Sequence, residues 1–159
     1  MVEDVVRSLG LLSLGTRMKR IGERLQADTQ RIIEDEGLDL AAAQHPFLAA
    51  LDRLGPIGLG ELAEAVGVAQ PGATRTVKAL ATLDLVTVDD VPGDRRRRVV
   101  RLSAAGVTLV ETAKRRVWPR VERAVADLCA GLDGPLLEQL ARIEDDLAVL
   151  PLDRREDHR

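Results

Sequence analysis

The chain has 159 residues, of which 45% are hydrophobic and 31% are charged, a composition typical of a single folded domain. One Trp, one Phe and no Tyr leave almost no material for the aromatic stacking platforms of many single-strand and RNA binders. One Cys and two His exclude an internal disulfide framework and a site of several thiolates, so we expect no metal, no cofactor and no enzymatic activity.

No apolar run approaches the roughly 18–20 residues that a membrane span needs, and the N-terminus lacks the cationic start of a signal peptide. The sequence therefore predicts a cytoplasmic protein without a membrane partner. The net charge of −3 is segregated along the chain. Between Gln70 and Arg101, seven cationic side chains stand against four acidic ones, so that stretch carries +3 and the remainder −6. This segregation is the first indication of a polyanionic partner.

Apolar residues near a 3.6-residue period predict a long helix from Val5 to about Glu36 and a second helical segment from Asp39 to Leu54. Three glycines weaken the interior of the first helix, by about 1 kcal/mol each relative to Ala. Pro46 removes an amide donor inside the second segment, so it predicts a kink or a late start there.

Two short helices are predicted next, at Leu59–Val66 and Gln70–Leu83, with Gly67 in the turn that joins them. This arrangement is a helix-turn-helix, whose second helix can enter a major groove while its apolar face stays buried. The residues of this helix that we expect at DNA are Gln70, Pro71, Gly72, Thr74, Arg75, Thr76 and Lys78. Arg75 can form a bidentate contact with guanine, and Lys78 can meet a phosphate.

Two segments rich in β-branched residues, Leu85–Val88 and Arg97–Leu102, predict a hairpin whose turn is Asp89–Asp94. A narrow tip crowded with arginines suits an adjacent minor groove, where the negative potential is enhanced. The residues of this wing that we expect at DNA are Asp94, Arg95, Arg96, Arg97 and Arg98. Asp94 is expected to hold an arginine in one rotamer.

Ser103 is a good N-cap for a further helix of about 27 residues, which Pro119 should bend. The last predicted helix, Leu136–Leu150, spaces its apolar residues like a heptad seam. The seam could pack within one subunit, but we favour a seam between subunits because few other elements can cover the long helices.

The predicted fold is therefore mainly α with a small β wing: a winged helix-turn-helix core plus N- and C-terminal dimerisation helices. In one interdigitated domain, residues 1–36 would form the N-terminal dimerisation helix and 37–102 the DNA-binding lobe. Residues 103–150 would form the C-terminal dimerisation helices, and 151–159 a charged tail.

The run from Leu59 to Leu80, together with the wing motif Asp94-Arg95-Arg96 and the following Val99–Gly106, resembles the winged helix-turn-helix of MarR-type repressors. The resemblance covers about residues 5–150. It implies an obligate homodimer, pseudo-palindromic operators and release by small molecules, often aromatic or acyl carboxylates. Two departures weaken helix starts: Gly58 replaces the usual hydroxyl residue, and Ala69 is a poor cap.

The leading hypothesis is a homodimeric regulator of transcription that binds double-stranded DNA sequence-specifically, as a repressor released by a small organic acid. The effector is expected between the first two helices and the fifth, near Leu14, Met18, His45 and Leu48, although a purely structural role stays open for His45. The alternative is a winged-helix module that binds proteins and no DNA, against which the arginine-rich tip argues.

Overall fold

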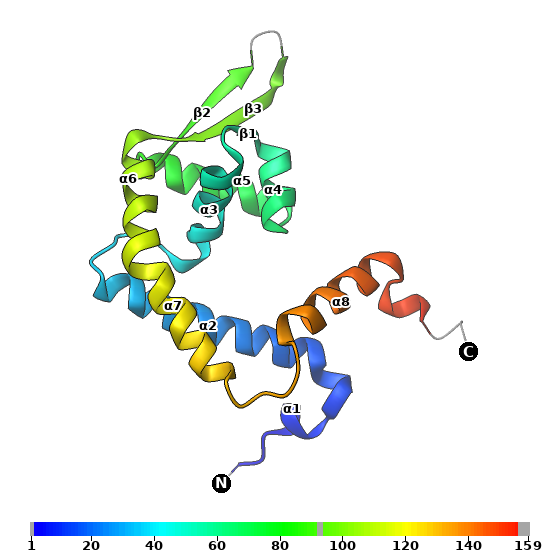
Figure 1. Ribbon diagram of the computed structural model, residues 1–159. Helices are drawn as coiled ribbons and strands as arrows, with labels where there is room; N and C mark the ends of the chain where they lie inside the picture. The colour runs from blue at the N-terminus through cyan, green and yellow to red at the C-terminus, as the bar shows by residue number, and fades with distance from the viewer. Residues whose placement is uncertain (1, 92–93, 156–159) are drawn as a thin grey trace. The chain divides into compact units, whose positions relative to one another are not determined.

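The computed structural model describes residues 2–91 and 94–155, and for residues 91, 94–97 and 154 it describes the backbone alone. The chain divides into two compact units, residues 1–122 and 123–159. The first unit holds most of the helices and a three-stranded sheet, and the second holds the C-terminal helix α8 (Figure 1). α8 spans Leu136–Val149 and is followed by the short 3-10 helix η4, Leu152–Arg154.

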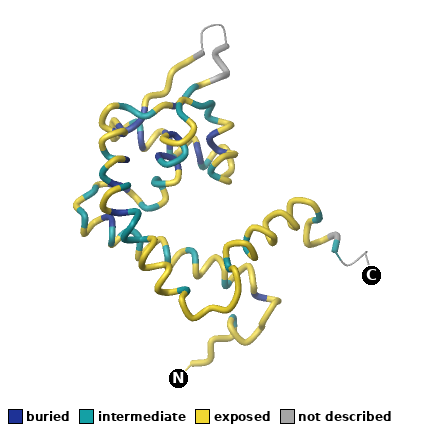
Figure 2. The backbone as a smooth tube through the Cα atoms, viewed as in Figure 1, coloured by how far each residue is buried: buried dark blue, intermediate teal, exposed yellow. Residues whose placement is uncertain are grey.

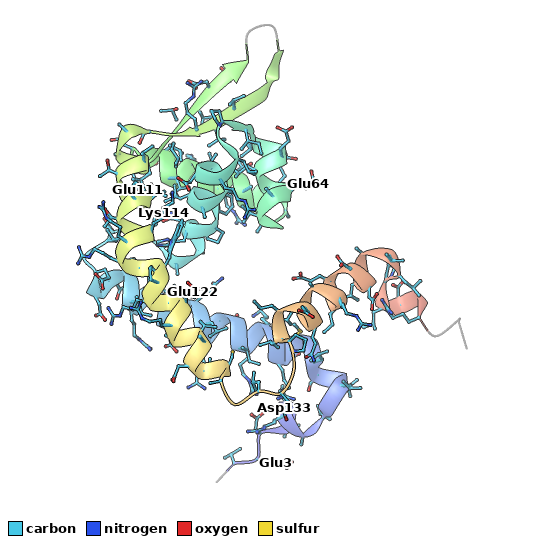
Figure 3. All side chains as sticks on the ribbon, viewed as in Figure 1. Glu3, Glu64, Glu111, Lys114, Glu122 and Asp133 are labelled. Atoms are coloured by element: carbon cyan, nitrogen blue, oxygen red, sulfur yellow. The ribbon has the colours of Figure 1, made fainter. Side chains whose placement is uncertain are left out.

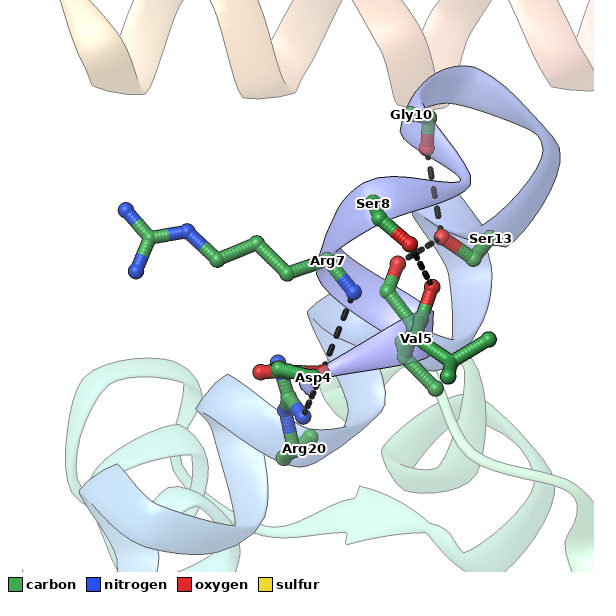
Figure 4. Close-up of polar contacts among 8 residues, drawn as sticks. Asp4, Val5, Arg7, Ser8, Gly10, Ser13 and Arg20 are labelled. Carbon is green, nitrogen blue, oxygen red and sulfur yellow. Dashed lines mark hydrogen bonds and ion pairs between the residues drawn. The ribbon is translucent and has the colours of Figure 1, made fainter. Parts of the chain in front are cut away.

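The N-terminal segment forms α1 (Val5–Ser8), the 3-10 helix η1 (Gly10–Ser13) and α2 (Leu14–Asp35). The continuous helix predicted from Val5 is therefore wrong in its first part. Gly10 has φ +58°, which takes the chain out of the α-helix, and the Ser13 hydroxyl donates to the carbonyls of Val6 and Gly10 (Figure 4).

Asp4 ties this turn back onto α2. Its carboxylate accepts hydrogen bonds from the Arg20 guanidinium at 3.0 and 3.1 Å (Figure 4). These bonds from Arg20, followed by the bond from the Arg7 amide, hold the pKa of Asp4 below its usual value.

The second predicted segment starts late, as Pro46 indicated. The 3-10 helix η2 spans Ala42–Gln44, and α3 spans His45–Leu54 with Pro46 in its first turn, where a helix needs no amide donor. The expectation of a helix from Asp39 is wrong by about six residues, because a proline is accommodated only at the start of the helix.

The helix-turn-helix follows the short strand β1 (Ile57–Gly58) and consists of α4 (Leu59–Val66) and α5 (Gln70–Thr82). The Gly58 amide donates to Glu61 Oε2 at 3.0 Å, so the acidic half of a capping box is present. Gly67 ends α4 with φ +72°, the left-handed conformation expected of it.

The sheet has the order β1-β3-β2 and is antiparallel throughout. β2 spans Val86–Val91 and β3 spans Asp94–Leu102, both longer than predicted. The turn expected at Asp89–Asp94 is wrong because Asp89 and Asp90 continue the ladder opposite Val99 and Arg98. Within the expected turn, residues 92–93 lie outside the described part of the chain.

The helix predicted to start after Ser103 is interrupted. α6 spans Ala104–Thr112, a π turn (η3) spans Ala113–Val117, and α7 spans Trp118–Cys129. Pro119 has no amide to donate to the carbonyl four residues earlier, so a wider turn just ahead of it relieves the mismatch. The sequence predicted a bend at Pro119, whereas the structure has a π turn just before that residue.

The core lies entirely in the first unit, where buried residues gather among the helices and the sheet (Figure 2). It comprises Ile33, Leu40, Phe47, Leu48, Leu51, Leu62, Ala63, Ala73, Val77, Leu80, Leu85, Val86, Val100, Val110, Ala113 and Val117. Among the described residues of 123–155, none is buried. Within the ranges that the structure describes, no helix combines the length and hydropathy of a membrane span.

Candidate nucleic-acid interface

The two helices of the helix-turn-helix pack through small and aliphatic side chains. α4 buries Leu62 and Ala63, and α5 buries Ala73, Val77 and Leu80. The spacing of four and three along α5 places these three side chains on one face. The opposite face of α5 is therefore left for a partner.

That outward face carries the predicted recognition residues. Gln70, Pro71, Thr74, Arg75 and Lys78 are exposed, and Gly72 and Thr76 are half-buried. Among the contacts described, none engages the guanidinium of Arg75 or the ammonium of Lys78. Within the described contacts, both cations are thus available to an anionic partner.

The first turn of α5 is open at its backbone. Ala69 caps it without a side-chain hydrogen bond, and the Thr74 hydroxyl donates to the Gln70 carbonyl at 2.9 Å. A Cβ on Gly72 would have no heavy atom within 4 Å, so this turn presents bare backbone. Such a turn lets a DNA strand approach closely.

For most of the wing residues expected at DNA, the structure describes the backbone alone. Residues 94–97 lie in β3, but the side chains of Asp94, Arg95, Arg96 and Arg97 are outside the described atoms. Arg98 is exposed, and its Nε lies 3.8 Å from Asp90 Oδ1. Its expected DNA contact therefore starts from an ion pair.

A second ion pair lies further down the hairpin. Arg101 Nη2 is 2.8 Å from Asp89 Oδ2. Neither pair was anticipated, because the sequence analysis placed Asp89 and Asp90 in a turn. The strand register would have revealed both pairs, since Asp90 lies directly opposite Arg98 and Asp89 is two residues from the position opposite Arg101.

The base of the wing is fastened to the end of the recognition helix. The Ser103 hydroxyl accepts from the Gly106 amide at 2.9 Å and donates to the Asp84 carbonyl. The Ser103 amide donates to the Leu85 carbonyl at 3.0 Å, and Gly106 lies so close to that carbonyl that a Cβ would collide with it. These contacts hold the wing and α5 in one rigid lobe.

His45 lies at the start of α3 and pairs with Trp118. Its Nδ1 accepts a hydrogen bond from Trp118 Nε1 at 3.2 Å, while its buried Nε2 has no partner among the described residues. Burial lowers the pKa of His45. Because Nδ1 accepts the bond from Trp118, the neutral form of the imidazole carries its proton on Nε2.

The other predicted effector residues lie in different environments. Leu48 is fully buried in the core, whereas Leu14 and Met18 are about 40% exposed on α2. α2 meets the segment before α3 through Gln30, which bonds Leu40 and Ala42. Met18 precedes Gln30 by 12 residues, about 18 Å of helix. One chain thus does not bring all four side chains together.

Ion pairs connect α3 and the end of α2 to the π turn and α7. Lys114 lies between Asp52 of α3, at 2.8 Å, and Glu111, at 3.1 Å (Figure 3). The hydrogen bonds that Lys114 donates to Asp52 and then to Glu111 raise the pKa of Lys114. Arg116 pairs with Glu36 at 2.8 Å, and Arg120 pairs with Asp35 and Glu36.

The sequence profile of the MarR family matches residues 37–97, which hold the helix-turn-helix and most of the wing. Over these residues the chain is similar to the MarR family. The predicted fold class, mainly α with a winged helix-turn-helix, is confirmed.

The repressor NicR of Pseudomonas putida is 32% identical to this chain over 98 residues. The match spans 58% of this chain and 62% of NicR, less than two thirds of that relative.

Two solved structures are similar over most of the chain. BpsR of Bordetella bronchiseptica, whose DNA binding is regulated by 6-hydroxynicotinic acid, has a TM-score of 0.66 and 26% identity, covering 85% of this chain and 98% of BpsR. The transcriptional repressor CouR, bound to a 23-mer DNA duplex, has a TM-score of 0.71 and 29% identity, covering 86% and 96%. These proteins are transcriptional regulators and not enzymes, in agreement with the sequence analysis.

Proposed function

We propose that the protein is a homodimeric repressor that binds double-stranded DNA sequence-specifically and is released by a small organic acid. The observation that carries the proposal is the outward face of α5. There Arg75 and Lys78 are exposed over a buried apolar face and have no ion-pair partner among the residues whose side chains are described. Arginine reads guanine and lysine meets phosphate, so this face supplies both specificity and affinity.

In a dimer, two such helices enter successive major grooves on one side of the duplex. Their centres lie about 34 Å apart, one turn of B-DNA. The wings reach the flanking minor grooves, where cationic side chains meet the enhanced negative potential. CouR, which has a similar fold, is bound to a DNA duplex.

The test is selection of bound sequences from random duplex DNA by the purified protein. We expect a pseudo-palindrome whose half-sites are about one helical turn apart. Selection without enrichment would contradict sequence-specific binding, and enrichment of a single half-site would contradict the dimer. Failure to retain any duplex at low salt would favour the protein-binding alternative.

The homodimer is supported by apolar side chains that the chain leaves uncovered at both ends. The exposed ones include Val5, Leu9, Leu11, Leu12 and Ile21 near the N-terminus and Leu128, Leu137, Ile143 and Leu147 near the C-terminus. A monomer would expose this area to water at a cost of about 25 cal/mol per Å². Pairing with a second copy removes that cost.

The proposed effector is an aromatic carboxylic acid that lies beside His45. The buried Nε2–H of His45 is a donor without a partner among the described residues, and a carboxylate oxygen would satisfy it. Leu14 and Met18 would join this site from a second subunit, because on α2 they lie at least about 18 Å of helix before Gln30, the residue that contacts the segment ahead of α3. The ligand of BpsR, 6-hydroxynicotinic acid, provides the first probe.

Calorimetric titration with 6-hydroxynicotinate and nicotinate tests this site. We expect binding that weakens DNA affinity and that falls about tenfold or more in His45→Ala, because a hydrogen bond to a charged group is lost. Equal affinity of the wild type and His45→Ala for the acid would remove His45 from the effector site.

A further inference from the structure

The paired strands of the wing, residues 86–91 and 98–102, form a stem whose two faces each carry one ion pair. Asp90 lies opposite Arg98, on the face that includes Val88 and Val100. Asp89 and Arg101 lie on the other face, because strand side chains alternate. Val86 and Val100 on the first face are buried in the core, so only the outer end of that face, with Asp90 and Arg98, is exposed. On either face, the exposed arginine is already matched by an aspartate.

We propose that Asp89 and Asp90 limit the sequence-independent part of DNA binding by occupying Arg101 and Arg98. The inference rests on the proposed function, in which the wing meets DNA. It assigns the two aspartates a role in specificity: they keep the stem from binding any phosphate backbone and so leave discrimination to the recognition helix.

The ion pairs are loose enough to exchange with DNA. All four side chains are more than half exposed, and exposed pairs contribute little to folding stability. An arginine can therefore leave its aspartate for a phosphate. The carboxylate left behind stays within a screening length of about 8–10 Å, where it repels the phosphate. Each phosphate contact by the stem thus carries a penalty that is independent of base sequence.

Among the contacts described, no aspartate or glutamate pairs with the cations on the outward face of the recognition helix α5. Arg75 and Lys78 on α5 have no carboxylate partner there, in contrast to the paired arginines of the stem. Contacts from α5 are therefore made without displacing an internal anion. Since phosphate contacts supply nearly all non-specific affinity, restraining the stem lowers that component most.

The experiment measures binding of the full-length protein to a 30-bp duplex pool of random sequence by fluorescence anisotropy, at 50–200 mM KCl. The variant is Asp89→Asn/Asp90→Asn. We expect tighter binding at 50 mM and a salt dependence steeper by about one unit for each bound subunit, since only one face of the stem meets the duplex. The ratio of the variant's affinity to the wild-type affinity should therefore fall about threefold per bound subunit between 50 and 200 mM KCl.

A matched control separates this effect from net charge. Asp28→Asn/Glu23→Gln also removes two carboxylates from exposed ion pairs, with Arg31 and Lys19, but on α2. The control should bind the random pool like the wild type. All variants should keep the wild-type melting temperature, because the pairs are at the surface.

A second pair of substitutions tests whether the two aspartates act through Arg98 and Arg101. In Arg98→Gln/Arg101→Gln, removal of the two aspartates should no longer strengthen binding. A gain that persists there, or an equal gain in the α2 control, would overturn the inference. Wild-type binding with no change in Asp89→Asn/Asp90→Asn would overturn it and leave the proposed function standing. A wild type that binds neither random nor selected duplexes would overturn both.

Discussion

Arg75 is the side chain whose removal tests base reading most directly. It is exposed on α5 and has no internal partner among the described contacts. We expect Arg75→Ala to relax the preference at one position of each half-site and to cost about 1–3 kcal/mol on the selected operator. Selection from random DNA and titration of the operator measure both effects.

Arg24→Ala is the control for that change, because Arg24 is an exposed arginine on α2, outside the helix-turn-helix. It should leave the selected sequence unaltered. An unchanged base preference in Arg75→Ala would show that Arg75 contacts no base.

His45 predicts a pH dependence of stability. Burial lowers its pKa in the folded protein below the ordinary value of about 6.5, so the unfolded chain binds the proton first as pH falls. The neutral imidazole makes its full contribution to the free energy of unfolding above that ordinary pKa. This contribution is lost as pH falls toward the pKa of the folded protein, by at most about 1.4 kcal/mol per pH unit.

The measurement is urea unfolding at pH 7.5, 6.5 and 5.5, followed by the fluorescence of Trp118, the single tryptophan of the chain. His45→Asn keeps an acceptor near Trp118 but does not titrate, so its stability should fall less over this range. Parallel pH profiles for the two proteins would contradict the assignment.

Single side chains were predictable where periodicity alone decides exposure. The polar face of α5 follows from the spacing of Ala73, Val77 and Leu80. The bond between His45 and Trp118 was not predictable, because it joins residues 73 positions apart. No local pattern encodes a contact that depends on how α3 and α7 pack.

Among the elements, the junction between the wing and α6 depends on Gly106. A Cβ there would collide with the Leu85 backbone carbonyl, which is already bonded to Ser103. We expect Gly106→Ala to destabilise the fold by about 1–3 kcal/mol through overpacking against backbone. Denaturant unfolding measures the loss.

Gly60→Ala is the matched substitution, since a Cβ at Gly60 in α4 meets no atom within 4 Å. It should leave stability unchanged or slightly raised. Equal losses in both variants would point to a general effect of Gly→Ala and against the close approach at Gly106.

The elements themselves were predictable where local signals are strong. Gly67 and the apolar spacing placed α4 and α5 within a residue of their observed ends. The break at Gly10 was missed, because a glycine weakens a helix without requiring it to end. The lengths of β2 and β3 were missed because Asp89 and Asp90 are typical turn residues, whereas the strand register places them in the ladder opposite Val99 and Arg98.

For the molecule as a whole, the main prediction is the homodimer. Ile143 and Leu147 of α8 are 38% and 45% exposed, although they belong to the predicted seam. Ile143→Asn/Leu147→Asn should raise the dissociation constant of the dimer more than about tenfold, because burial of each side chain contributes about 1.5–3 kcal/mol. Sedimentation velocity over a dilution series measures the constant.

Asp145→Asn is the control for these changes, because Asp145 is exposed on the other side of α8 and receives the same amide side chain. It should assemble like the wild type. A wild type that stays monomeric at micromolar concentration would contradict the dimer itself.

The similarity to the MarR family was predictable from the order of the helix-turn-helix and the wing, because the matched residues 37–97 hold all of the first and most of the second. The surface that covers the terminal helices was not predictable in the same way. An apolar seam is consistent with packing within one subunit and with packing between two subunits. The exposed leucines of α8 remain consistent with the prediction that a second subunit does.

The π turn at Ala113–Val117 has a consequence for insertions and deletions. An α-helix rotates by about 100° per residue, so the surplus residue of a π turn offsets everything after it by one such step. Excising one residue there would swing the stripe of Val121, Val125 and Leu128 about a quarter of the way around its axis. An insertion or deletion in the loop at residues 131–135 would leave the face presented by α7 unchanged. The same change before Trp118 would rotate the apolar stripe of α7 about the helix axis.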